Sequence, residues 1–224
     1  MIRLILFDID GTLIKTGGAG EKAFAKVCEQ EFNIPNATEN IRFAGRTDPA
    51  IVREFFQLFG IAPTPEHFAR FFSAYVIWLE RMLLTLDGNV LPGVHELIAA
   101  FRAMSHRPLI GLLTGNIKQG ALLKLTHYRL WDSFAMGAYG DDHEDRNQIA
   151  AIARDRGAKL LGTKLPGEEI LVIGDTPRDV ECGNAIQAKV LAVATGIFSV
   201  DQLRSCKPHW LVPNLAGVNA HELL

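Results

Sequence analysis

Two aspartates stand two residues apart directly after the first apolar run of the chain. Asp8 and Asp10 follow residues 2–7, a run of branched and aromatic side chains that is typical of a buried parallel strand. In an extended segment, side chains two residues apart point to the same side. A carboxylate in such a place can act as a nucleophile, and a second one beside it can donate and accept protons. The pair indicates chemistry at the end of this strand.

Other polar residues follow later apolar runs in the same way. They are Thr114, Gly115 and Asn116 after residues 109–113, and Asp175 and Asp179 after residues 170–173. In open parallel sheets, ligands bind beyond the carboxyl ends of the strands. We therefore expect these residues to share one site with the first two aspartates.

Several carboxylates in one site repel one another unless a cation lies between them. Mg²⁺ suits oxygen ligands, and it usually takes one or two carboxylates together with a phosphate oxygen. The cluster of Asp8, Asp10 and Asp175 therefore predicts a magnesium site that accepts a phosphate ester. One oxygen of Asp8 then stays free to attack phosphorus and form an aspartyl phosphate.

The remaining steps of that reaction have candidate residues too. Asp10 can protonate the leaving oxygen and later take a proton from the attacking water. The hydroxyl of Thr114 and nearby backbone N–H groups can hold phosphoryl oxygens, and Gly115 allows the backbone to come close. A cation must still balance the charge on the transferring group.

Short strand patterns separated by helical patterns predict βαβ units around a parallel sheet. The strand patterns cover residues 2–7, 108–113, 170–173 and 189–194, with a weaker one at residues 134–138. Between about residues 16 and 87 only helical periodicity remains. Its clearest helix spans residues 68–86, where apolar side chains recur in steps of three and four.

The fold class predicted by this order is α/β, with a Rossmann-like parallel sheet and an inserted small helical domain. We expect the sheet domain to comprise residues 1–15 and 89–224, and the helical cap domain to comprise residues 16–88. Residues 16–20 are rich in glycine but lack the Gly-Lys-Ser/Thr ending of a phosphate-binding P-loop. A hinge into the helical domain is the favoured interpretation.

Composition narrows the classes of partner. The 224 residues include 23 Lys and Arg against 25 Asp and Glu, so no basic surface for nucleic acid is expected. No segment approaches the run of about 20 apolar residues that a membrane helix needs. The expected protein is cytoplasmic, a monomer or a homodimer, and acts on a small phosphorylated metabolite. Three scattered cysteines are expected to stay reduced.

Three sequence motifs resemble those of the haloacid dehalogenase superfamily. They are Asp8-Ile9-Asp10-Gly11-Thr12-Leu13, Thr114-Gly115-Asn116 and Gly174-Asp175-Thr176-Pro177-Arg178-Asp179. With the helical insertion, the chain is similar to the phosphoglycolate phosphatase and β-phosphoglucomutase branch. The resemblance implies Asp8 as nucleophile, Asp10 as acid and base and Thr114 as phosphate binder. It also implies Mg²⁺ held by Asp8, the Asp10 carbonyl and Asp175, with Asp179 supporting the metal.

The basic residue of this family's third motif is the least clear element. The family usually has a lysine at the start of the helix before the fourth strand, and here that helix begins near Arg146. We assign the role to Arg146, whose guanidinium can contact both a phosphoryl oxygen and a carboxylate. Lys159 and Lys164 are the alternatives. In the helical domain, Arg46 either closes over a substrate anion or belongs to a plain surface turn.

Some residues have a structural explanation as well. Asp179 falls at the third position of a helix capped by Thr176, where a carboxylate stabilises the helix N-terminus in any case. Two other functions share the same carboxylates. One is a sugar phosphomutase, which returns the phosphate to a sugar, and the other is a non-enzymatic phospho-receiver. Asp10 and the helical insertion argue against the receiver.

Overall fold

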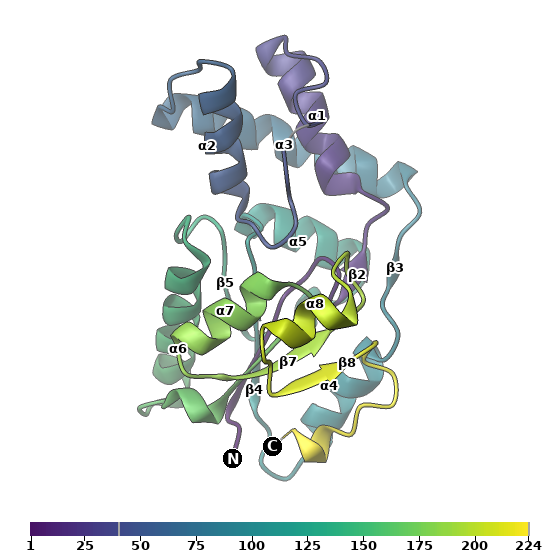
Figure 1. Cartoon of the computed structure of the whole chain (residues 1–224), viewed down its shortest axis with the longest axis vertical. Coiled ribbons are helices and arrows are strands. Elements are labelled where there is room, and N and C mark those ends of the chain that lie inside the picture. Colours follow the sequence, from purple (N-terminus) through teal and green to yellow (C-terminus); the bar gives the residue numbers. More distant parts are fainter. Residues whose placement is uncertain (40, 224) are drawn as a thin grey trace.

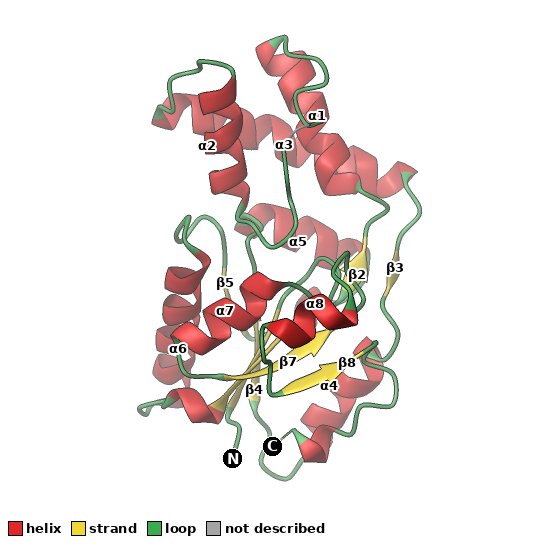
Figure 2. Cartoon of the chain, viewed as in Figure 1, coloured by secondary structure: helices red, strands yellow, loops and turns green. Residues whose placement is uncertain are grey.

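The protein is built on a six-stranded parallel sheet with helices in front of it and behind it in the view of Figures 1 and 2. The computed structural model describes residues 1–39 and 41–223. In spatial order the strands are β5 (Met136–Ala138), β4 (Leu109–Leu113), β1 (Leu4–Phe7), β6 (Ile170–Gly174), β7 (Lys189–Val193) and β8 (Trp210–Val212). The predicted α/β class is confirmed, because each of the five apolar runs forms a strand.

Both faces of the sheet are covered by helices. On one face, Ile5 and Phe7 of β1 share an apolar core with α4 (Val94–Ala103) and α5 (Lys118–His127). On the other face, Leu4 and Leu6 pack in a second core with α6 (Arg146–Leu161), α7 (Pro177–Ala185) and α8 (Val200–Ser205). This alternation follows from the two-residue period of a strand, and burial on both faces explains why β1 is apolar throughout.

Strand register brings the predicted site residues to one edge. Phe7 of β1 pairs with Leu112 of β4 on one side and with Ile173 of β6 on the other. The residues that follow these three strands therefore leave the sheet at the same level. The sheet thus places the three sequence motifs side by side, as the parallel arrangement predicts.

A separate layer of three helices lies beyond this edge, at the top of Figure 1. We call α1 (Ala19–Phe32), α2 (Asp48–Leu58) and α3 (Pro65–Thr85) the helical layer. Its core is aromatic: Phe24, Phe55 and Phe71 are buried against one another. The predicted apolar stripe of α3 is confirmed, since Phe71, Tyr75, Leu79 and Leu83 are its buried side chains.

Two chain segments connect the sheet to the helical layer, and they pair with each other. They form a two-stranded antiparallel sheet of β2 (Ile14–Lys15) and β3 (Asn89–Val90). Gly17 and Gly18 follow with positive φ angles of 63° and 82°. The predicted domain boundaries fall at this pair of strands, and the division into two domains remains a prediction.

Smaller elements complete the chain. The 3₁₀ helices η1 (Trp131–Ser133), η2 (Gly167–Glu169) and η3 (Ala220–Glu222) lie in connections and near the C-terminus. The sequence patterns missed β8, β2 and β3, because these strands are two or three residues long and two of them pair only with each other.

No helix within residues 1–39 and 41–223 combines the length and apolar content needed to cross a membrane.

Candidate active site

Asp8 begins the loop after β1 and is almost fully buried, with 6% of its surface exposed. Its backbone N–H donates to the carbonyl of Ile173 at 2.9 Å, which extends the pairing of β1 and β6 by one residue. The sheet therefore fixes the backbone from which this carboxylate projects.

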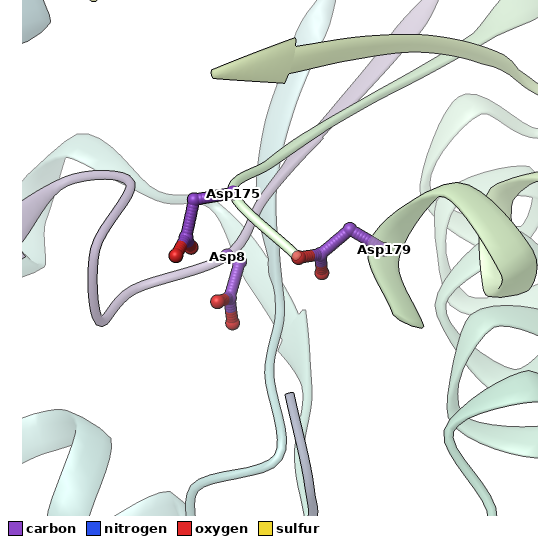
Figure 3. A group of neighbouring side chains, drawn as sticks. All are labelled: Asp8, Asp175 and Asp179. Carbon is purple, nitrogen blue, oxygen red and sulfur yellow. The ribbon is translucent and has the colours of Figure 1, made fainter. Parts of the chain in front are cut away.

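Three carboxylates meet at this edge, as Figure 3 shows. Each of Asp8, Asp175 and Asp179 offers an oxygen, and these oxygens lie within 4.8 Å of one another. Asp8 and Asp175 directly follow neighbouring strands, whereas Asp179 comes from the first turn of α7. The structure thus brings together three of the four predicted metal ligands.

The loops after β1 and β7 pack tightly around Asp175. The hydroxyl of Thr12 donates to Oδ1 of Asp175 at 2.9 Å. A Cβ atom at Gly11 would lie 2.4 Å from Oδ2 of the same carboxylate, and one at Gly196 would lie 1.8 Å from it. Only glycine fits at these two positions, so the backbone itself packs against Asp175.

Asp179 caps a helix and also lies among the clustered carboxylates. Its carboxylate accepts hydrogen bonds from the N–H and the hydroxyl of Thr176, which completes a capping box at the start of α7. It also faces the carboxylate cluster. The capping role is therefore confirmed, and the support of a metal by Asp179 stays a prediction.

Arg146 supplies the positive charge opposite the cluster. It is the first residue of α6, whose N-cap Asp145 accepts a hydrogen bond from the N–H of Asn147. Nη2 of Arg146 lies 2.9 Å from Oδ1 of Asp8 and 2.5 Å from Oδ1 of Asp179. The structure thus puts Arg146 at the predicted place, while Lys159 is exposed in the last turn of α6.

The electrostatics of the cluster fit a divalent cation. Burial raises the pKa of Asp8 to about 6 from 3.8, with Arg146 opposing the shift and the neighbouring carboxylates adding to it. Burial and the nearby carboxylates also raise the pKa of Asp175 well above its ordinary value. Three buried carboxylates and one guanidinium leave an excess of negative charge, which a hard cation with oxygen ligands would neutralise. Asp8, Asp175 and Asp179 are the residues that could hold Mg²⁺.

The loop after β4 lies beside the cluster, and its three predicted residues are near one another. Thr114 is fully buried, and its hydroxyl accepts a hydrogen bond from Nδ2 of Asn116 at 2.8 Å. A Cβ atom at Gly115 would lie 2.1 Å from the carbonyl oxygen of Arg46, so this position has room only for glycine.

The Asp10 carboxylate lies apart from the three clustered ones. Its side chain is 43% exposed, and Oδ2 accepts from Nζ of Lys124 at 2.7 Å and from Nδ2 of Asn116 at 2.8 Å. The predicted metal contact of Asp10 was through its carbonyl, which this placement leaves untested. Sequence reasoning missed Lys124. No motif or spacing pointed to it, because its partner Asp10 lies 114 residues away in the chain.

The helical layer contacts the sheet edge next to these residues. Asp48 of α2 donates its N–H to the carbonyl of Gly115 and accepts from the N–H of Ile117, both at 2.8 Å. Arg53 of α2 pairs with Glu144, two residues before Arg146.

Arg46 has a different environment from the one needed to hold a substrate. Its guanidinium pairs with Glu54 and donates to the carbonyls of Arg42 and Ala50, all within the helical layer or the loop before α2. In this structure the Arg46 side chain therefore stabilises the local turn. Its predicted contact with a substrate anion stays a prediction.

A doubly wound parallel sheet with buried carboxylates and a guanidinium at its carboxyl edge is typical of enzymes with a Rossmann-like fold. A sequence model of the family "Haloacid dehalogenase-like hydrolase" matches residues 5–193. The chain therefore belongs to the haloacid dehalogenase-like hydrolases, and the resemblance of the motifs is confirmed.

Several known proteins are similar to this chain in sequence or in fold. The "Probable phosphatase IndB" of Dickeya dadantii is 25% identical over 99% of this chain and 94% of its own. A crystal structure of a predicted phosphoglycolate phosphatase from Haemophilus somnus has a TM-score of 0.75 at 18% identity, covering 96% of this chain and 95% of its own. The β-phosphoglucomutase of Clostridium difficile has a TM-score of 0.76 at 17% identity, covering 99% and 95%. These two structures show the shared fold.

Proposed function

We propose that the protein is a magnesium-dependent phosphatase of a small phosphate monoester, with Asp8 as the nucleophile. The observation that carries this proposal is the cluster of Asp8, Asp175 and Asp179 against Arg146. Bound Mg²⁺ would neutralise the phosphate dianion and polarise a phosphoryl oxygen. The name of the Dickeya relative supports phosphatase chemistry.

In the first step, an oxygen of Asp8 attacks phosphorus. The new bond gives an aspartyl phosphate, while the bond between phosphorus and the ester oxygen breaks. Asp10 gives a proton to the leaving oxygen, because an alkoxide is a poor leaving group. Arg146 and the Thr114 hydroxyl hold the transferring group and balance its charge.

In the second step, a water molecule attacks phosphorus from the side that the alcohol has left. Asp10, now ionised, takes a proton from this water. The bond to Asp8 breaks, and inorganic phosphate leaves. Atoms and charges balance, and Asp8 and Asp10 return to their starting states.

The helical layer is proposed to act as a cap over this edge. Asp48 and Arg53 link it to the sheet through Ile117 and Glu144. Closure excludes bulk water from the aspartyl phosphate, and opening releases the product. The enclosed position of the carboxylates favours a small metabolite over a macromolecule, and a cytoplasmic location is proposed with it.

Phosphate release from a panel of phosphate esters, with and without Mg²⁺, tests this function. Phosphoglycolate comes first, because the motifs resemble that branch of the family. We expect magnesium-dependent release of inorganic phosphate that EDTA abolishes. An isomeric sugar phosphate in place of inorganic phosphate would indicate a phosphomutase. A long-lived phosphoaspartate without turnover would indicate a receiver, and either result would contradict the proposal.

A further inference from the structure

Lys124 is a charged residue in an enclosed place that the reaction as described does not use. It lies on α5 and only 3% of its surface is exposed. Lysine is almost never fully buried unless its charge is paired. Its side chain must therefore have partners that compensate for the loss of water.

Two of these partners are residues of the site. Nζ of Lys124 donates to Oδ2 of Asp10 at 2.7 Å and to Oδ1 of Asn116 at 2.6 Å. Nδ2 of Asn116 donates to the same Oδ2 at 2.8 Å. The three side chains thus form a closed triangle of hydrogen bonds, in which each one fixes the other two.

The triangle holds the Asp10 carboxylate by one oxygen only. Oδ2 accepts from both donors, whereas Oδ1 has no hydrogen-bond partner among residues 1–39 and 41–223. The Asp10 side chain is 43% exposed, so its free oxygen is open to a substrate or to water. A carboxyl group that transfers a proton needs this arrangement, with one oxygen anchored and the other presented.

The helical layer covers the ammonium group. A Cβ atom at Gly20 of α1 would lie 3.5 Å from Nζ of Lys124 and 3.4 Å from the hydroxyl oxygen of Tyr75 on α3. Gly20 of α1 therefore lies close to the lysine, with Tyr75 beside it. Because water is largely excluded there, the hydrogen bond from Lys124 to Asp10 is stronger than an exposed one.

We propose that Lys124 is a positioning residue, which orients the Asp10 carboxylate for proton transfer to the leaving group. It acts through Asp10 and touches neither phosphorus nor the predicted metal position. This inference rests on the proposed function. It adds that a lysine of α5, which the helical layer shields from water, orients the residue that acts as acid and base.

The test compares two kinds of ester in a single turnover, with enzyme in excess over substrate. An alkyl phosphate needs a proton on its leaving oxygen, whereas p-nitrophenyl phosphate releases a stable phenolate without one. Lys124→Met should slow alcohol release from the alkyl ester by about 10²-fold, the lower end of what a positioned acid contributes. Release of p-nitrophenolate should change only slightly, and Asp10→Asn should show the same selectivity.

A double mutant separates positioning from general support of the fold. If Lys124 acts through Asp10, adding Lys124→Met to Asp10→Asn causes no further loss with the alkyl ester. Lys22→Met, at an exposed position of α1, is the matched control and should leave both rates unchanged. Lys124→Gln, which keeps a donor but loses the charge, replaces the methionine variant if that variant does not fold.

Three results would overturn the inference. One is an equal loss for both esters, and another is an additive loss in the double mutant. The third is a crystal structure of the Lys124→Met variant in which Asp10 keeps its side-chain conformation. The crystal structure tests whether Lys124 orients Asp10 even if the wild-type protein hydrolyses no ester. A wild-type protein without any ester hydrolysis would refute the proposed function, but it would leave the orientation of Asp10 by Lys124 to be decided by that structure.

Discussion

Nη2 of Arg146 lies 2.9 Å from Oδ1 of Asp8, and both side chains are buried. The same nitrogen contacts Asp179 at 2.5 Å, so one guanidinium compensates two carboxylates. A buried charge without its partner destabilises a fold strongly. Arg146 therefore supports both the stability of this edge and the charge balance of the proposed reaction.

Replacing Arg146 by methionine should show both effects. Without Mg²⁺, the free energy of unfolding in urea should fall by about 3–5 kcal/mol, because two carboxylates lose their buried counter-charge. Phosphatase turnover should fall by at least about 10²-fold, as for other lost transition-state donors. Arg146→Lys keeps the charge and should keep part of the activity.

Arg154→Met, which removes an ion pair with exposed Asp155 on the same helix, is the control for this change. It should alter the free energy of unfolding by less than about 1 kcal/mol, as is usual for surface ion pairs. Full activity of Arg146→Ala would show that Arg146 does not have the third-motif role. Added Mg²⁺ should recover part of the lost stability by binding the folded state.

Asp48 gives a pH-dependent prediction for stability. Burial raises its pKa to about 6 from 3.8, although Lys124 and the N–H of Ile117 oppose the shift. A raised folded-state pKa means that the protonated form favours folding. This contribution is complete below the unfolded value of 3.8 and is lost as the pH rises through about 6.

Asp48→Asn keeps an oxygen that can accept from Ile117 but does not ionise. At a pH well below 3.8 the variant and the wild type should unfold at similar urea concentrations, because Asp48 is then neutral in both the folded and the unfolded state. At a pH above 7 the variant should be more stable by about 1–2 kcal/mol. A wild type that is the more stable one at the higher pH would contradict this.

The cysteines differ in accessibility. Burial raises the pKa values of Cys28 and Cys182 to about 12, so neither forms a reactive thiolate near neutral pH. Cys206 is half-buried near the end of α8. Iodoacetamide should therefore label only Cys206 in the folded protein and all three cysteines in urea, as judged by mass spectrometry. Rapid native labelling of Cys28 or Cys182 would be inconsistent with their burial.

Gly115 is predicted to be essential for contact between the helical layer and the sheet edge. A Cβ atom there would lie 2.1 Å from the carbonyl oxygen of Arg46, which is backbone and cannot rotate away. Gly115→Ala should lower the free energy of unfolding by about 1–3 kcal/mol, as overpacking does. It should lower activity as well, because it displaces the loop before α2.

Gly120→Ala is the matched control on α5. Its added Cβ atom would meet side chains at 3.4 Å or more, which is ordinary contact. Since alanine favours a helix over glycine by up to about 1 kcal/mol, this variant should be as stable as the wild type or more so. Equal stability and activity of the two alanine variants would contradict the prediction for Gly115.

Five strands of the parallel sheet and the carboxylate cluster could be predicted from sequence because both follow from local patterns. An apolar run that ends in Asp8 or Asp175 indicates a buried strand, and parallel strands place their carboxyl ends together. The third-motif residue was predicted at Arg146 from the start of a helix, and the structure has it at the cluster.

What could not be predicted depends on contacts between distant elements. Lys124 lies on an ordinary helical pattern, and its partner Asp10 is 114 residues away. The sequence around Asp48 is typical of a helix start. Its contact with Ile117 is seen only in the structure, where α2 packs on the loop after β4.

The covalent intermediate on Asp8 is the central claim, and it can be observed directly. The enzyme is mixed with its best ester and Mg²⁺, quenched in acid within the first turnover and digested for mass spectrometry. We predict the added mass of one phosphoryl group on the peptide that contains Asp8, and its absence in the Asp8→Asn variant, which should release no phosphate. Phosphate release by Asp8→Asn at the wild-type rate, or a phosphoryl group on another residue, would contradict the account.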